Sequence, residues 1–209
     1  MALEYILVDP GSGRKVATDQ YTQGADVLDV QVVKIAHGAD GALDGCADEL
    51  TPLPVNQRQA GTVITVTPTV STTPAYASGD AVGGKLTLPN AVRLAGGVGI
   101  IRSIVLTDKG KQNAAIDVVV FRADPTATTF TDNAALSVAD ADLLSIAGVV
   151  SVAAADYAAF VDNSVATKSG LGLAVNSITT TLYACLVTRG TPTFTASSDL
   201  QLTVVIEQY

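Results

Sequence analysis

The chain has 209 residues, a formal net charge of −8 and a sequence pI of about 4.4, so it is not expected to bind a nucleic-acid backbone or an anionic membrane surface. Hydrophobic residues make up 48% of it and charged residues 15%, yet no apolar run reaches the ~20 residues that a membrane span requires. A single histidine and two cysteines leave little material for acid–base or metal chemistry. The composition favours a structural role over catalysis.

Short apolar segments separated by turn-forming residues make up the first part of the chain. Residues 5–8 predict a short strand that ends at the Asp-Pro-Gly-Ser-Gly cluster of residues 9–13. Residues 27–35 are rich in valine and predict a second strand, and residues 62–70 alternate Thr with Val or Ile as a half-buried strand does. We therefore predict an extended N-terminal arm with short strands over residues 1–74.

From residue 75 onward, strands and turns follow one another at steady spacing, which is typical of a β-sandwich or jelly roll. We therefore predict an all-β fold with little helix, whose β-sandwich (jelly-roll-like) domain covers residues 75–209. The only serious helix candidate is the Ala-rich stretch 151–160, with Ser151 as candidate N-cap. The expected strands lie at residues 84–88, 99–106, 115–121, 172–175, 180–188 and 200–207, with apolar pieces at 142–152 and 157–161.

Two of these segments, residues 116–121 and 182–187, carry apolar residues on both faces. A strand of this kind has no side that favours water. One interpretation places both strands centrally in a sheet that is covered from outside by the arm or by a neighbouring subunit. The alternative is an ordinary sandwich core.

Residue types that carry chemistry are scarce and scattered. His37 is the only histidine and lies at the edge of a glycine-rich turn, where we expect a solvated side chain. Cys46 and Cys185 are far apart with no metal-binding spacing, so we expect reduced thiols, with Cys185 filling the core. The glycine-rich residues 96–99 and 170–172 predict tight turns rather than phosphate loops. No enzyme, metal or cofactor is predicted.

Acidic residues form two small groups, one at Asp40, Asp44, Asp48 and Glu49 and the other at Asp140 and Asp142. Their spacing does not match an EF-hand loop. The interpretation is a hydrated acidic loop, with an irregular calcium site as the alternative.

Several segments resemble virion proteins of tailed bacteriophages. Residues 30–41 (VQVVKIAHGADG) look like an opening common in such proteins, and residues 78–89, 101–109 and the pieces between 117 and 134 are similar to a domain seen repeatedly in them. Together these segments cover about half of the chain. The resemblance implies a capsid decoration (cement), head-fibre, neck or tail role, and it transfers no catalytic residue.

Composition and resemblance together predict a non-enzymatic virion structural protein. We expect a capsid decoration protein, assembled in the host cytoplasm, that stabilises the phage head from the capsid exterior. Its expected partners are the major capsid protein and its own copies in a homotrimer, with no nucleic acid and no membrane. The arm is expected to supply the partner interface through Tyr5, Ile6, Leu7, Val8, Val27, Val30, Val32 and Ile35.

Two alternatives belong to other classes of protein. A head-fibre or tail/neck module that binds the host surface or a glycan would present exposed tyrosines, such as Tyr76 and Tyr157, at one end of the sandwich. A calcium-dependent secreted adhesin would melt at a higher temperature when calcium is added.

Overall fold

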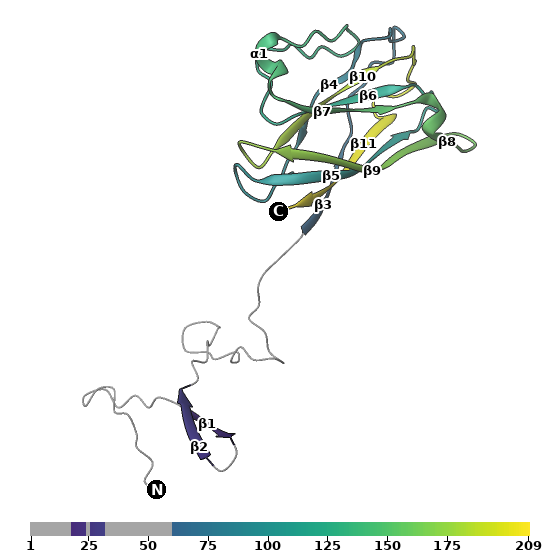
Figure 1. The fold of residues 1–209 in the computed structure, drawn as a ribbon. Helices are drawn as coiled ribbons and strands as arrows, with labels where there is room; N and C mark the ends of the chain where they lie inside the picture. Colours follow the sequence, from purple (N-terminus) through teal and green to yellow (C-terminus); the bar gives the residue numbers. More distant parts are fainter. Residues whose placement is uncertain (1–17, 24–25, 32–59) are drawn as a thin grey trace. The chain divides into compact units, whose positions relative to one another are not determined.

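The computed structural model describes residues 18–23, 26–31 and 60–209 (Figure 1). The chain forms two compact units, Met1–Gln57 and Arg58–Tyr209. In the first unit the described residues form an antiparallel pair of strands, β1 (Thr18–Gln23) and β2 (Asp26–Gln31).

The second unit is a sandwich of two antiparallel sheets, with strand orders β4-β10-β6-β7 and β3-β11-β5-β9-β8. Helix is limited there to the single turn α1 (Asp140–Leu143) and the 3₁₀ turn η1 (Ala154–Asp156). The predicted all-β fold class is confirmed. The strands are β3 (Ala60–Val66), β4 (Ala81–Leu88), β5 (Val98–Asp108), β6 (Ile116–Phe121), β7 (Ile146–Val152), β8 (Tyr157–Ala159), β9 (Ser164–Asn176), β10 (Leu182–Thr188) and β11 (Leu200–Gln208).

The strand pairs are nested around the β6–β7 connection. β6 pairs with β7, β5 with β9, β4 with β10 and β3 with β11, as though one long hairpin had been folded across two sheets. Pairing of β5 with β11 and of β6 with β10 joins the folded halves within each sheet. This nesting is the jelly-roll topology.

Strand β3 belongs to the sandwich, although its residues fall within the predicted arm. It pairs with β11 from Ala60 opposite Gln208 to Val66 opposite Leu202, and its Ile64 is buried in the core. The partner strand lies more than 130 residues away in sequence, so no local pattern could assign β3 to either part. Residues 67–74 of the predicted arm lead from β3 toward β4 and are also described. The rest of the predicted arm, apart from β1 and β2, lies outside the described residues.

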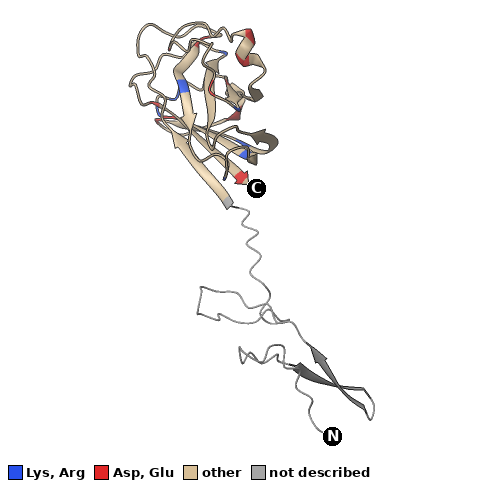
Figure 2. Ribbon diagram, turned by 90° about the vertical axis from the view of Figure 1, so that its left-hand side faces the viewer, with Lys and Arg blue, Asp and Glu red and all other residues tan. Residues whose placement is uncertain are grey.

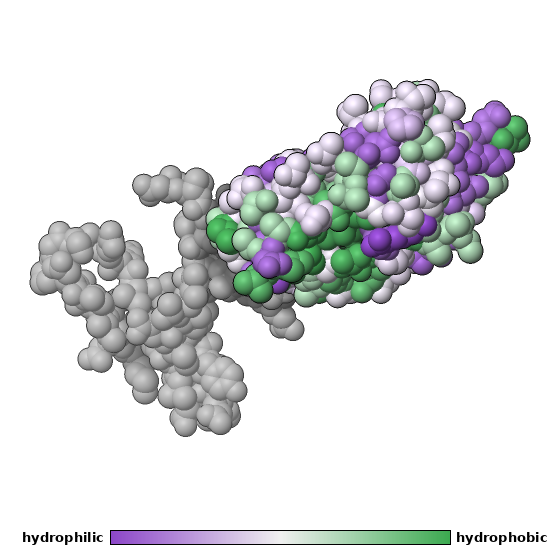
Figure 3. All heavy atoms as spheres, turned by 90° about the horizontal axis from the view of Figure 1, so that it is seen from above, coloured by the Kyte–Doolittle hydropathy of each residue, from purple (hydrophilic) through white to green (hydrophobic). Residues whose placement is uncertain are grey.

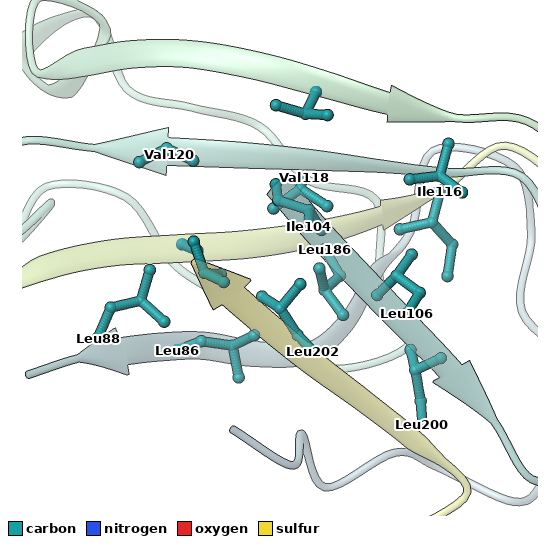
Figure 4. Close-up of a cluster of buried hydrophobic side chains, with 14 of the residues drawn as sticks. Leu86, Leu88, Ile104, Leu106, Ile116, Val118, Val120, Leu186, Leu200 and Leu202 are labelled. Carbon is teal, nitrogen blue, oxygen red and sulfur yellow. The ribbon is translucent and has the colours of Figure 1, made fainter. Parts of the chain in front are cut away.

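The main core fills the space between the two sheets (Figure 4). Strand β11 alternates strictly between buried and half-buried residues, so Leu200, Leu202 and every second residue after them point inward. Strand β5 contributes Ile104 and Leu106, both fully buried. Each such side chain contributes about 1.5–3 kcal/mol of burial free energy.

A second, smaller core explains the strands that are apolar on both faces. Val119 and Phe121 of β6 and Cys185 of β10 are buried on the outer side of the four-stranded sheet. They pack there against side chains of the β6–β7 connection (residues 122–145), among them Phe130, whose ring meets that of Phe121 edge to face at 5.9 Å. The β6–β7 connection therefore covers this face. One interpretation of the sequence had assigned that cover to the arm or to a neighbouring subunit.

The carboxylate of Asp132 fastens this connection to the sandwich, together with backbone hydrogen bonds that residues 133–136 make with residues 79–81. It accepts hydrogen bonds from the backbone N–H of Ser71 (2.8 Å) and of Gly83 (2.6 Å), from the Tyr76 hydroxyl (2.7 Å) and from the Ser71 hydroxyl. Burial acts to raise the pKa of Asp132, but these hydrogen bonds together lower it below its ordinary value. Gly83 has φ +73°, and a Cβ there would lie 2.1 Å from Pro68 Cβ, so only glycine fits.

The predicted helix at residues 151–160 is wrong. The structure has there the end of β7, the 3₁₀ turn η1 and the short strand β8. Val150 and Val152 pair with β6 and bury their side chains in the main core, which outweighs the helix propensity of the alanines that follow.

We predict that Asp132→Asn lowers the free energy of unfolding by about 2–3 kcal/mol, because an amide cannot accept from all four donors. Urea denaturation measures this loss, and Asp140→Asn, an exposed acid of the same connection, is the control. Because folding lowers the pKa of Asp132, its contribution is full above the ordinary carboxyl value of 3.8 and is lost as the pH falls through the folded-state value. Equal urea midpoints for the variant and the wild type at neutral pH would refute this stabilising role of Asp132.

Candidate functional site

Exposed apolar side chains gather at one end of the sandwich. We call it the apolar end, and it is formed by the β4–β5 connection (residues 89–97), the β9–β10 connection (residues 177–181), the start of β5, the C-terminus and the segment just before β7. Of the ten large hydrophobic residues that are exposed in the described part of the chain, six lie here: Leu94, Val98, Leu143, Leu144, Ile178 and Tyr209. The side chains of Leu94 and Ile178 are 72% and 70% exposed.

Backbone hydrogen bonds join four of the five segments of the apolar end, all except the segment just before β7. Gly96 N–H donates to Ser177 O at 2.8 Å, and Ser177 N–H donates to Gly97 O at 3.2 Å, which ties the two connections together. Tyr209 N–H donates to Val98 O at 3.1 Å, which ties the C-terminus to the start of β5. The apolar side chains are thus presented by a fixed backbone, and this limits the entropy lost when they are buried by a partner.

Charged groups lie beside the apolar side chains. Arg93 precedes Leu94, and the Arg102–Glu207 ion pair lies next to Tyr209. Over the rest of the sandwich the charged residues are scattered (Figure 2). Seen from above, apolar atoms gather over the left and middle of the described surface, and hydrophilic atoms are more frequent toward the right (Figure 3). Exposed apolar groups rimmed by polar residues are typical of a protein–protein interface.

Strand β3 begins at the apolar end, because its Ala60 lies opposite Gln208 at the end of β11. Of the predicted interface residues, Val27 and Val30 lie in β2, opposite Thr22 and Asp19 of β1. The other six, Tyr5, Ile6, Leu7, Val8, Val32 and Ile35, lie outside the described residues. Their role as an interface stays a prediction.

Cys185 is a free thiol buried in β10, and burial raises its pKa to about 12. It is therefore unreactive core material at neutral pH, as predicted. Asp142 is also buried and accepts a hydrogen bond from the Thr128 hydroxyl at 2.6 Å, which makes it structural. His37, Cys46 and the acidic group at residues 40–49 lie outside the described residues.

The tyrosines expected at an exposed glycan site are not exposed. Tyr76 is 1% exposed and donates its hydroxyl to Asp132, while its ring packs edge to face on Phe194. The Tyr157 hydroxyl is buried as well. That part of the sequence prediction is wrong, because aromatic content alone does not show which face of a strand a ring occupies.

No protein-family model matches the sequence, and no curated protein is significantly similar to it. Among solved structures, a chain of Desmodium yellow mottle tymovirus is similar at 15% identity over 85% of this chain and 94% of that chain, with a TM-score of 0.24. This similarity is too low to assign a fold, so the jelly-roll topology is identified from the strand pairing alone. Within the described residues, no helix is long and apolar enough to cross a membrane.

We predict that the full-length protein self-associates through the apolar end. The double variant Leu94→Asp, Ile178→Asp places two charges in the interface and removes two apolar contacts worth about 1.5–3 kcal/mol each, so its association weakens about 100-fold or more. Sedimentation velocity over a concentration series measures the effect, with circular dichroism to verify folding.

The matched control is Val161→Asp, which charges an 87% exposed valine in the β8–β9 turn, at the opposite end of the sandwich. It should associate like the wild type. The proposal that the apolar end is the self-association surface would be contradicted if the double variant formed assemblies of the same mass as the wild type. It would also be contradicted if the control dissociated as much as the double variant.

Proposed function

We propose that this protein is a non-enzymatic structural protein of a virus particle, and that it acts as a capsid decoration protein of a tailed bacteriophage. In this role it binds the major capsid protein and copies of itself on the capsid exterior. The observation that carries the proposal is the apolar end, an exposed apolar surface at the end of the sandwich where strand β3 begins.

The fold supports this role in a general way. Jelly rolls occur repeatedly in viral capsid proteins, although lectins and cupins share the architecture. Three of the segments that resemble phage virion proteins lie in the sandwich, because residues 78–89, 101–109 and 117–134 include most of β4, β5 and β6. The resemblance therefore concerns the sandwich core as well as the N-terminal part.

In the proposed mechanism the apolar end provides contacts between copies, as in a homotrimer around a symmetry axis. The residues before Arg58 provide contacts with the capsid. Each contact stabilises by about 25 cal/mol per Å² of apolar area buried, less the entropy lost by residues that become ordered on binding. Neither contact requires a cofactor, and the net charge of −8 disfavours contact with packaged nucleic acid.

A second candidate function is that of a head-fibre or tail/neck module that binds the host surface or a glycan. It is favoured by the β8–β9 turn at the opposite end of the sandwich, where Phe160 and Val161 are 58% and 87% exposed. With the apolar end buried in an assembly, this turn would face away from the particle. Binding of the protein to host cells that is lost in Phe160→Ser would favour this candidate.

We predict that the full-length protein binds capsids that lack it and raises their resistance to heat. A truncation that removes residues 1–57 should lower capsid occupancy about tenfold or more and leave self-association intact, since residues 58–209 form their own compact unit. Co-sedimentation with capsids followed by quantitative gel analysis measures occupancy. Unchanged occupancy of the truncated protein would refute the capsid role of the N-terminal part, and failure of the full-length protein to bind would refute decoration.

A further inference from the structure

Three of the four sheet edges of the sandwich carry features that oppose pairing with another chain. At the β4 edge, Gly83 and Gly84 have positive φ and lie where the register with β10 shifts. At the β7 edge, the register with β6 shifts as well. β8 is only three residues long, and the part of β9 that it leaves unpaired is bulged at residues 170–172. Bulges and short edge strands are devices by which proteins keep sheet edges from pairing with other chains.

The fourth edge, β3, has none of these features. Its pairing with β11 runs through all of its residues, from Ala60 to Val66, without a register shift (Figure 1). These residues include no proline and no charged side chain. β3 is the end strand of its sheet, and within the described residues it makes no backbone hydrogen bond to a segment other than β11. Its outer edge therefore presents N–H and C=O groups with which an added strand can pair.

The side chains at this edge favour contact with another copy of the same acidic chain. Val63 is 65% exposed on the outer face of the sheet. The hydroxyl of Thr65 is hydrogen-bonded to that of Thr203 on β11 at 3.1 Å. The one charged residue of β11, Glu207, forms an ion pair with Arg102. Copies with a net charge of −8 repel one another, and this repulsion is weakest where the meeting surfaces carry no net charge.

We propose that β3 pairs with β3 of a second copy, antiparallel and about a two-fold axis at Val63, so that two five-stranded sheets join into one continuous sheet. In this register Val63 lies opposite Val63 of the second copy, and Thr65 lies opposite Gly61. Val63 is the middle residue of β3, so this is the register that pairs every residue of the strand.

Pairing of β3 with itself also matches the two faces of the sheet. Side chains alternate between the faces along a strand, and a slip of one residue would place core-facing residues beside outward-facing ones. About Val63, each residue lies opposite one that is an even number of positions away in sequence. The buried Ile64 therefore lies beside Thr62 of the second copy, which faces the same side. A strand from an unrelated protein has no such built-in match, and this favours a second copy as the occupant of the edge.

This contact goes beyond the proposed function and does not depend on it. The contact at the apolar end is made by exposed side chains, whereas the β3 contact is made by backbone hydrogen bonds. A two-fold contact closes on itself, so it links two assemblies that form through the apolar end. Its test needs no capsid, and its failure would leave the decoration role untouched.

Disulfide cross-linking of the full-length chain tests the pairing. Directly opposite residues of antiparallel strands have Cα atoms about 4.5–5.5 Å apart, which a disulfide can bridge. Val63→Cys in a Cys46→Ser background should therefore convert most of the chain to covalent dimers under mild oxidation, as detected on non-reducing gels. Cys185 does not compete, because its thiol is buried and burial raises its pKa to about 12.

Thr65→Cys in the same background is the matched control, because Thr65 is also exposed and lies two residues further along the same face. In the proposed register the two introduced thiols are about 13 Å apart along the strands, too far for a disulfide. This variant should give no covalent dimer alone. Mixed with Gly61→Cys, which lies opposite it, it should give covalent heterodimers.

A charge at the axis gives a second measurement. Cross-linking through Val63→Cys should persist when Leu94→Asp and Ile178→Asp weaken the apolar end. In that background Val63→Lys should weaken the remaining association about tenfold or more by sedimentation equilibrium, whereas Thr167→Lys, an exposed position on β9, should leave it unchanged. The pairing would be overturned if Val63→Cys gave no covalent dimer, if Thr65→Cys alone cross-linked equally, or if the two lysine variants behaved alike.

Discussion

The attachment of the β6–β7 connection to the sandwich, through Asp132 and through the backbone hydrogen bonds of residues 133–136, is the constraint on which the rest of this structure depends. The four-stranded sheet has apolar side chains on both faces, and only one face can meet the other sheet. The β6–β7 connection covers the second face through Phe130 and its neighbours, and Asp132 fixes that connection to the β3–β4 segment and to β4. With this face covered from within, the exposed large apolar residues of the sandwich are concentrated at the apolar end.

Period-two patterns in the sequence were sufficient to predict the fold class and most of the strands. Strand β11, predicted at residues 200–207, alternates as expected and occupies Leu200–Gln208. The pairing of β3 and the cover over the outer face could not be predicted, because each depends on contacts between residues far apart in sequence. Phe130, Leu136 and Val138 lie in a Thr- and Asp-rich stretch, where isolated apolar residues predict only a loop.

Neither the apolar end nor the buried polar groups near Asp108 could be predicted from the sequence, for a related reason. Leu88 and Leu94 are only six residues apart, yet one is fully buried and the other 72% exposed, and this difference arises from packing and not from local pattern. Asp108 and Gly110 indicated a turn. Only the pairing of Asp108 with Ser164 shows that the turn ends at a buried oxygen cluster.

The two ends of the sandwich differ in physical character, and this difference favours attachment by one end. The apolar end presents large exposed apolar side chains, with Arg93 and the Arg102–Glu207 ion pair beside them, so burial of those apolar side chains against a partner would gain hydrophobic free energy. At the other end, polar groups are buried inside, and the Asp199 carboxylate accepts hydrogen bonds from Thr195 and Ala196 to hold the β10–β11 connection in place. That end is therefore stabilised from within the chain, whereas the large apolar side chains of the apolar end remain exposed.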